Sequence, residues 1–167
     1  KDRIENLSAY HSVQYSQAND VGDFRLRDQK SNYHGEAYLR PLVKTHPETD
    51  VRNLFIGRHA FGIPGLSRYE SRELLRSLLA FVISDESRVY SHQWQRGDTL
   101  FWDNRALLHR AMPYDYTQAR VLIGTRVAGD PATELAYYPS DPAAQAGRDA
   151  LAAELDILRE ATKGRMF

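Results

Sequence analysis

Cysteine is missing from the sequence altogether. Its absence excludes disulfides, thiolate nucleophiles and cysteine-type zinc sites, and it leaves His, Asp and Glu as the side chains that could bind a metal. The chain also has no excess of charge of either sign, because 22 Lys and Arg residues balance 22 Asp and Glu residues. We therefore expect no nucleic-acid partner, and any anion must bind at a local site.

Long apolar runs are absent as well. No stretch approaches the roughly 20 residues of a membrane span, and no apolar signal region follows Lys1. We therefore expect a cytoplasmic protein with no membrane partner. Because the chain does not start with Met, we also expect that Lys1 is not the natural first residue.

Composition divides the chain into three zones. Residues 1–38 are polar and irregular, and we expect a partly mobile segment with a loop over residues 12–30. Residues 39–130 carry short apolar runs separated by Pro, Gly and Asp, a pattern typical of antiparallel sheets. The candidate strands cover residues 42–43, 54–56, 89–94, 99–102 and 120–127. Residues 131–167 are expected to form a linker and a C-terminal helix.

Two helices are predicted. The first begins at Ser67, which forms a Ser-x-x-Glu capping box with Glu70, and an apolar face over residues 74–82 should lie across a sheet. The second covers residues 141 to about 163, and its apolar stripe consists of Leu151, Leu155 and Leu158. This helix either packs on its own domain or forms a subunit contact in a homo-oligomer. We favour the first because the stripe is narrow.

Among the six histidines, His109 has the most informative surroundings. It follows the run Trp102-Asp103-Asn104-Arg105 and two leucines, where an imidazole is costly unless its nitrogens have partners. Arg120 comes next, and by alternation its strand face would include Leu122, Gly124 and Arg126. A buried Arg on that face needs an anion, and a small dicarboxylate would supply it.

The other histidines are expected in less specific roles. His46 precedes Pro47 and suits a turn. His92 alternates with Tyr90 and Trp94, which favours packing across strands. His11 lies in the polar first zone and is expected in solvent.

Residues 41–130, above all Trp102-Asp103-Asn104-Arg105 with His109 and Arg120, resemble the C-terminal half of the taurine dioxygenase and 2,4-dichlorophenoxyacetate dioxygenase (TauD/TfdA) family. Enzymes of that family use Fe(II) and 2-oxoglutarate. The resemblance implies a mainly β protein with flanking helices, a double-stranded β-helix or jelly roll that is incomplete here on its N-terminal side. It also implies an iron site of two His and one carboxylate.

The same resemblance assigns roles to individual residues. His109 matches the distal His ligand of the iron, and Arg120 matches the Arg that pairs with the distal carboxylate of 2-oxoglutarate. Asp103 and Arg105 are expected to fix the loop that presents His109. The substrate-pocket candidates are His59, Phe61, Trp102, Gly124 and Arg126, and for His59 a structural role is equally open.

Two features depart from the family pattern. The family's His-x-Asp/Glu motif, which supplies the other two iron ligands, lies far upstream of the distal His. The match in this chain, His34-Gly35-Glu36, is interpreted as part of a loop. Gly124 stands where taurine dioxygenase has an Arg that holds the sulfonate, so either Arg126 substitutes for it or the substrate is a different anion or no anion.

The expected activity is hydroxylation of a small organic substrate, with 2-oxoglutarate and O2 consumed and succinate and CO2 released. Two other interpretations stay open. One is a non-catalytic jelly-roll module or an inactive fragment without two of the three iron ligands. The other is a metal-independent jelly roll that binds a sugar or an anion through Arg120 and Arg126. The substrate itself cannot be identified from these residues.

Overall fold

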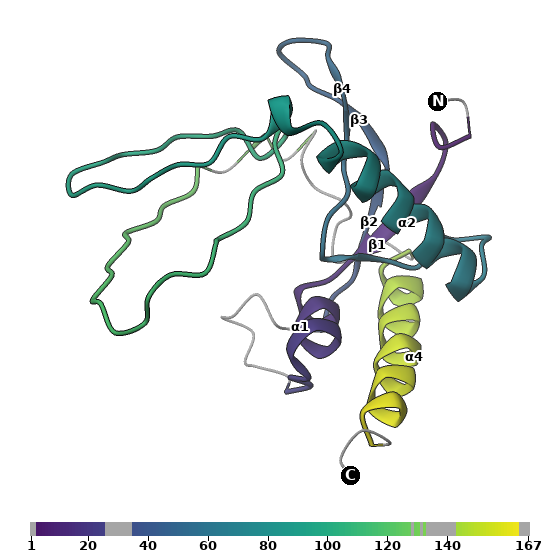
Figure 1. The fold of residues 1–167 in the computed structure, drawn as a ribbon. Coiled ribbons are helices and arrows are strands. Elements are labelled where there is room, and N and C mark those ends of the chain that lie inside the picture. Colours follow the sequence, from purple (N-terminus) through teal and green to yellow (C-terminus); the bar gives the residue numbers. More distant parts are fainter. Residues whose placement is uncertain (1–2, 26–34, 128, 131, 133–142, 164–167) are drawn as a thin grey trace.

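Two small antiparallel sheets form the centre of the computed structural model, which describes residues 3–25, 35–127, 129–130, 132 and 143–163 (Figure 1). The first sheet has the strand order β2-β1-β5 and the second pairs β3 with β4. The strands are β1 (Ser8–His11), β2 (Tyr38–Pro41), β3 (Val43–Thr45), β4 (Arg52–Leu54) and β5 (Ala60–Phe61). Tyr10 lies opposite Leu39 on one side and Phe61 on the other.

Helices flank these sheets, as the sequence predicted. They are α1 (Val13–Val21), α2 (Arg68–Ile83), the short 3-10 helix η1 (Glu86–Arg88) and α4 (Ala143–Lys163). The capping box at the start of α2 is confirmed, because Ser67 Oγ accepts from the Glu70 N–H while the Glu70 carboxylate accepts from the Ser67 N–H. No helix in the described parts of the chain is long and apolar enough to span a membrane.

The loop expected over residues 12–30 is wrong for its first part, because α1 occupies Val13–Val21. Ser12 caps this helix by accepting from the Tyr15 N–H. The pattern hid the helix because its buried face is partly polar: Gln14 and Ser16 are among its buried residues. β1 also falls in this polar zone and is the central strand of the first sheet.

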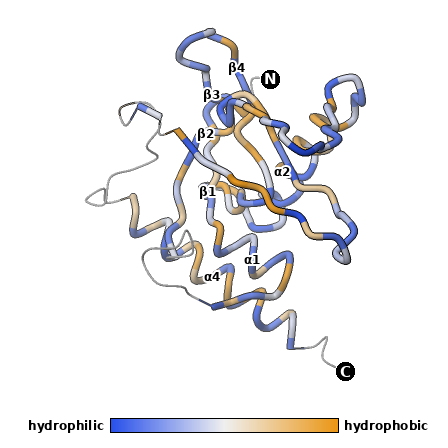
Figure 2. Tube along the Cα trace, turned by 90° about the vertical axis from the view of Figure 1, so that its left-hand side faces the viewer, coloured by the Kyte–Doolittle hydropathy of each residue, from blue (hydrophilic) through white to orange (hydrophobic). Residues whose placement is uncertain are grey.

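The first sheet separates two hydrophobic clusters. Figure 2 shows hydrophobic and hydrophilic residues alternating along α4. Ala9 and Tyr10 are neighbours on β1 and therefore face opposite sides of the sheet. On the Tyr10 side the cluster joins α1, β5 and α4, including the predicted stripe of Leu151, Leu155 and Leu158. On the Ala9 side the apolar face of α2 packs over Leu42, Ile56 and Ile63. This confirms both predicted helix faces and shows that α4 packs on its own chain.

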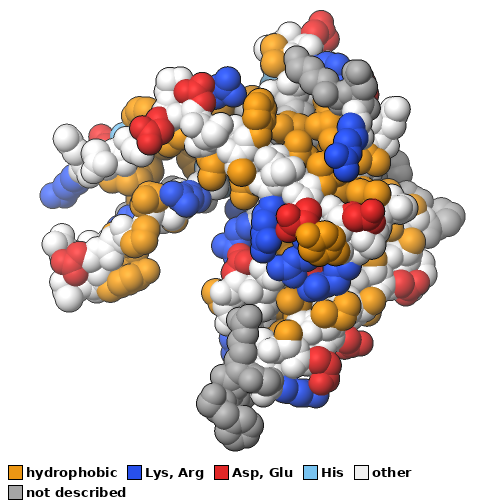
Figure 3. Space-filling view, turned by 45° about the vertical axis from the view of Figure 1, so that its right-hand side comes forward, with side chains coloured by type: hydrophobic (Ala, Val, Ile, Leu, Met, Phe, Trp, Pro, Cys, Tyr) orange, Lys and Arg blue, Asp and Glu red, His pale blue; other side chains and the backbone are white. Residues whose placement is uncertain are grey.

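Residues 89–127 extend away from the sheets and helices as two long arms (Figure 1). The strands expected at 89–94, 99–102 and 120–127 are not formed there. A strand needs a neighbouring ladder partner for its backbone and a surface for its apolar face, and the described chain supplies neither to these segments. Their apolar side chains are therefore exposed, including Phe101, Ile123 and Val127. Figure 3 shows hydrophobic side chains on the surface of both arms.

Candidate functional site

The run Trp102-Asp103-Asn104-Arg105 forms a turn that leads to His109. The Asp103 carbonyl accepts from the N–H groups of Ala106 at 3.2 Å and Leu107 at 3.1 Å. Trp102 Nε1 donates to Asn104 Oδ1 at 2.9 Å, and the rings of Trp102 and His109 lie 5.1 Å apart. The turn thus places the indole against the imidazole proposed as a metal ligand.

His59 reaches the same region from the loop before β5. Its Nδ1 lies 2.8 Å from Ser16 Oγ, and the Ser16 hydroxyl donates its proton to the Val13 carbonyl. The Nδ1–H of His59 therefore donates to Ser16, which leaves Nε2 as an acceptor. Burial lowers the pKa of His59, and the charge of Arg58 lowers it further. These effects favour the neutral form of His59, in which Nε2 is the unprotonated nitrogen.

Two observations bring His59 and the His109 segment together. Among the groups that affect the pKa of His59, His109 has the smallest effect, after burial, Arg58 and Asp20, so the two imidazoles interact. In addition, a β-carbon placed on Gly57 would lie 4.0 Å from Leu108 Cδ2. Three of the predicted site residues, His59, Trp102 and His109, therefore lie in one neighbourhood.

Asp103 and Arg105 form a fork-shaped ion pair inside the turn. Arg105 Nη2 donates to Asp103 Oδ2 at 2.7 Å, and the Arg105 N–H donates to Asp103 Oδ1 at 2.8 Å. Bonds from Arg105, and then from His46, hold the pKa of Asp103 well below its usual range. His46 Nε2 lies 3.0 Å from Asp103 Oδ2, so the turn is attached to the β3–β4 hairpin.

Sequence reasoning missed this role of His46. It placed the residue in a turn, and the backbone does turn there, because the Asp50 N–H donates to the His46 carbonyl at 2.9 Å. The side chain is buried, however, and its partner lies 57 positions further along the chain. No pattern of residues close in sequence predicts a contact between two side chains that are 57 positions apart.

Arg120, Gly124 and Arg126 lie on the second arm and are exposed. The expectation of a buried Arg120 on a strand face is therefore wrong in this structure, because residues 120–127 do not pair with another strand. The guanidinium of Arg120 lies 4.9 Å from the centre of the Tyr114 ring. A β-carbon on Gly124 would have no heavy atom within 4 Å.

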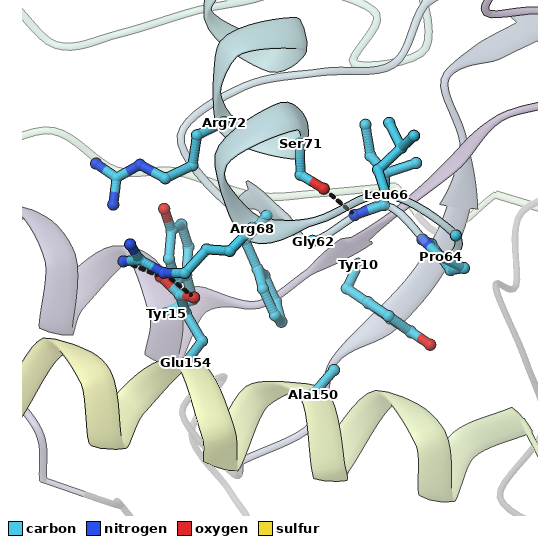
Figure 4. Close-up of a pocket in the computed structure, with 13 residues that line it drawn as sticks. Tyr10, Tyr15, Gly62, Pro64, Leu66, Arg68, Ser71, Arg72, Ala150 and Glu154 are labelled. Carbon is cyan, nitrogen blue, oxygen red and sulfur yellow. Dashed lines mark hydrogen bonds and ion pairs between the residues drawn. The ribbon is translucent and has the colours of Figure 1, made fainter.

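Phe61 lies in the core rather than beside His109. Its ring stacks on Tyr15 at 4.8 Å, and it lines a pocket of about 270 Å³ between α2 and α4 (Figure 4). Arg68 closes one side of this pocket by a bidentate pair with Glu154, at 2.7 and 2.8 Å. His59, Trp102 and His109 do not line it, so Phe61 and the three neighbouring site residues belong to separate places.

A complete metal site is not assembled by the residues that the structure describes. They contain no group of three or more His, Asp or Glu side chains that could hold a metal ion. Of the motif His34-Gly35-Glu36, His34 lies outside the described residues, and Glu36 forms a 3.4 Å ion pair with Arg148 on α4. The described chain therefore offers His109 as one imidazole donor and does not by itself fit an iron centre.

The resemblance to 2-oxoglutarate-dependent dioxygenases rested on residues 41–130, above all on the Trp-Asp-Asn-Arg run with His109 and Arg120, and it implied sheets with flanking helices. The family model described as "Taurine catabolism dioxygenase TauD, TfdA family" matches residues 1–126. The chain belongs to the TauD/TfdA family, which confirms the expected resemblance.

Relatives with assigned activities share about half of their length with this chain. The (S)-phenoxypropionate/alpha-ketoglutarate-dioxygenase of Sphingobium herbicidovorans is 48% identical over 140 residues, which are 81% of this chain and 48% of the relative. The protein of the same name from Delftia acidovorans is 44% identical, over 78% of this chain and 46% of the relative. The solved structure "AAD-2 in complex with Mn(II) and N-oxalylglycine" aligns with a TM-score of 0.59 and 33% identity, over 72% of this chain and 47% of that one.

Proposed function

We propose that this chain contributes the distal-histidine part of an Fe(II)- and 2-oxoglutarate-dependent dioxygenase. The enzyme hydroxylates a small organic substrate, consumes 2-oxoglutarate and O2, and releases succinate and CO2. The observation that carries this proposal is the neighbourhood of His109, Trp102 and His59 within a chain of this family. When bound, the iron supplies the oxygen chemistry, while the protein supplies ligands and a shaped site.

Each candidate residue has a role in this proposal. His109 donates one imidazole to the iron, and Arg120 pairs with the distal carboxylate of 2-oxoglutarate through its guanidinium fork. His59 and Trp102 form part of the wall beside the metal, and Gly124 and Arg126 lie toward the substrate. Residues 39–130 form part of a jelly roll, in which 89–94, 99–102 and 120–127 become strands once neighbouring strands pair with them.

An aromatic carboxylate is the substrate class that the relatives favour. Two relatives more than 40% identical to this chain are named for phenoxypropionate, an aryl ether that carries a carboxylate. Arg126 offers a cation for such a carboxylate, two residues beyond the glycine that replaces the sulfonate-binding Arg of taurine dioxygenase.

Metal and cosubstrate binding test the two central residues separately. We expect His109→Ala to abolish Fe(II) binding, and Arg120→Ala to weaken 2-oxoglutarate binding at least about 10-fold while Fe(II) affinity stays within a factor of about two. Anaerobic titration of the full-length enzyme with Fe(II), and then with 2-oxoglutarate, measures both affinities through the visible band of the chelate. Fe(II) affinity that is the same with and without His109 would favour the non-catalytic module instead.

A further inference from the structure

We propose that His46 is a positioning residue for His109. It holds Asp103, and through Asp103 the turn that carries His109, against the β3–β4 hairpin. This inference rests on the proposed function, because the position of His109 matters for activity only if His109 binds the metal. The argument uses the direction of each hydrogen bond, the burial of His46 and the lack of other polar ties to this part of the chain.

The hydrogen bonds of His46 indicate its tautomer. Its Nδ1 accepts from the Glu48 N–H at 3.2 Å, so the ring proton is on Nε2. That Nε2–H donates to Asp103 Oδ2 at 3.0 Å. The side chain is only 7% exposed, and the His46 N–H donates to the Val51 carbonyl at 2.8 Å. With both ring nitrogens and the backbone engaged, the imidazole is a rigid donor aimed at Asp103.

Asp103 carries this contact into the turn. The carboxylate that accepts from His46 also accepts from the Arg105 backbone N–H at 2.8 Å and from the Arg105 guanidinium at 2.7 Å. The Asp103 carbonyl starts the turn by accepting from Ala106 and Leu107. A single residue therefore joins His46 to the backbone that leads to His109.

Residues 89–127 are all described by the structure. Two side-chain hydrogen bonds connect them to described residues before position 89, and these bonds involve Asp103 and Arg105. The second of these is a 3.2 Å pair between Arg105 and Glu48, whose side chain is 71% exposed and therefore contributes little. The crevice beside His46 and Arg105 measures about 10 Å³, room for no more than about one water molecule. The bond between His46 and Asp103 is thus the main polar tie of the arms to the sheets.

Two substitutions at His46 separate its two nitrogens. His46→Gln places an amide N–H near the position of Nε2, where it can still donate to Asp103. His46→Asn keeps an acceptor near the position of Nδ1 for the Glu48 N–H, but the side chain ends short of Asp103. His92→Asn is the matched control, because His92 Nε2 contacts Asp98 Oδ2 at the same 3.0 Å within its own arm.

Amide hydrogen exchange of residues 103–109 is the primary measurement. We expect exchange about tenfold faster in His46→Asn, the factor expected for one hydrogen bond to a charged group, and rates within about threefold of wild type in His46→Gln and His92→Asn. Asp103→Ala removes the acceptor of the same bond and should also raise exchange, which covers the case in which His46→Asn does not fold. Unchanged exchange in the bond-breaking variants, or failure of Gln to restore it, would overturn the proposal.

Fe(II) affinity, measured anaerobically on the same substitutions in the full-length enzyme, tests whether the bond between His46 and Asp103 positions His109. His46→Asn should weaken Fe(II) binding severalfold, and His46→Gln should restore it. Faster exchange with unchanged Fe(II) affinity in His46→Asn would reject the positioning role. The proposed function fails in a different way, when His109→Ala itself leaves Fe(II) affinity unchanged, and that result does not depend on the exchange rates.

Discussion

Three imidazoles near the sheets, those of His11, His46 and His59, differ in the hydrogen bonds that their ring nitrogens make. His59 is held by Ser16, and His46 is held by the Glu48 N–H. His11, which the sequence placed in solvent, is instead largely buried against Phe55 at a ring distance of 5.1 Å, and its Nε2 has no hydrogen-bond partner. Its polar neighbours in the sequence gave no indication of this, because β1 becomes a central strand only in the folded sheet.

His11 makes stability depend on pH. Burial, followed by the charge of Arg40, lowers the pKa of His11 from 6.5 to about 3. The unfolded chain therefore takes up a proton before the folded one, so stability is complete above pH 6.5 and is lost as the pH falls toward 3. We expect the free energy of unfolding to fall by about 1.4 kcal/mol per pH unit in this window through His11 alone.

The measurement is urea unfolding of wild type and His11→Phe at about pH 7.5 and about pH 5. The variant cannot titrate at this position, so wild type should lose about 2 kcal/mol more than the variant between the two conditions. Equal losses in the two proteins would show that His11 is accessible to protons in the folded state.

Helix α4 depends on one glycine for its approach to the first sheet. A β-carbon on Gly147 would lie 2.3 Å from the Ala37 carbonyl oxygen, and Ala37 is itself 1% exposed. Any side chain at this position must push the helix away from the strand that follows Ala37. The predicted leucine stripe thus sets which face of α4 is buried, and Gly147 sets how closely that face approaches.

We expect Gly147→Ala to lower the free energy of unfolding by roughly 1–3 kcal/mol through overpacking, even though alanine favours a helix more than glycine by about 1 kcal/mol. Gly124→Ala is the control, because a β-carbon there has open space around it. Urea unfolding followed by circular dichroism measures both variants. A Gly147→Ala protein as stable as wild type would mean that α4 can shift without cost.

At the scale of the whole molecule, the sheets and helices form one packed part and the two arms form another. The two hydrophobic clusters draw their members from residues 4–82 and 150–158, whereas residues 89–127 contribute none. Contiguous exposed apolar residues such as those on the arms mark surfaces that other chain segments cover. This distribution fits the proposed jelly roll, whose neighbouring strands would bury them.

Limited proteolysis should detect this division. Between residues 68 and 127 we expect trypsin to cut first after Arg96, Arg110 or Arg120, because these arm residues are exposed and their backbone lies outside any helix or strand. Cuts within α2 should come later, since its backbone is protected by helical hydrogen bonds. Mass spectrometry of early fragments measures the order. First cleavage inside α2 would contradict the division.

Local chemistry in the sequence determined helices α2 and α4 and the motif. The capping box at Ser67, the spacing of leucines on α2 and α4, and the Trp-Asp-Asn-Arg run with His109 are all short-range patterns, and each depends on residues a few positions apart. Tertiary structure alone decided that β1 is central, that His46 holds Asp103 across 57 positions, and that Phe61 packs under α4. Tertiary structure also decided that residues 120–127 do not form a strand. A strand needs a neighbouring strand to pair with, and the spacing of residues within 120–127 does not show whether one is present.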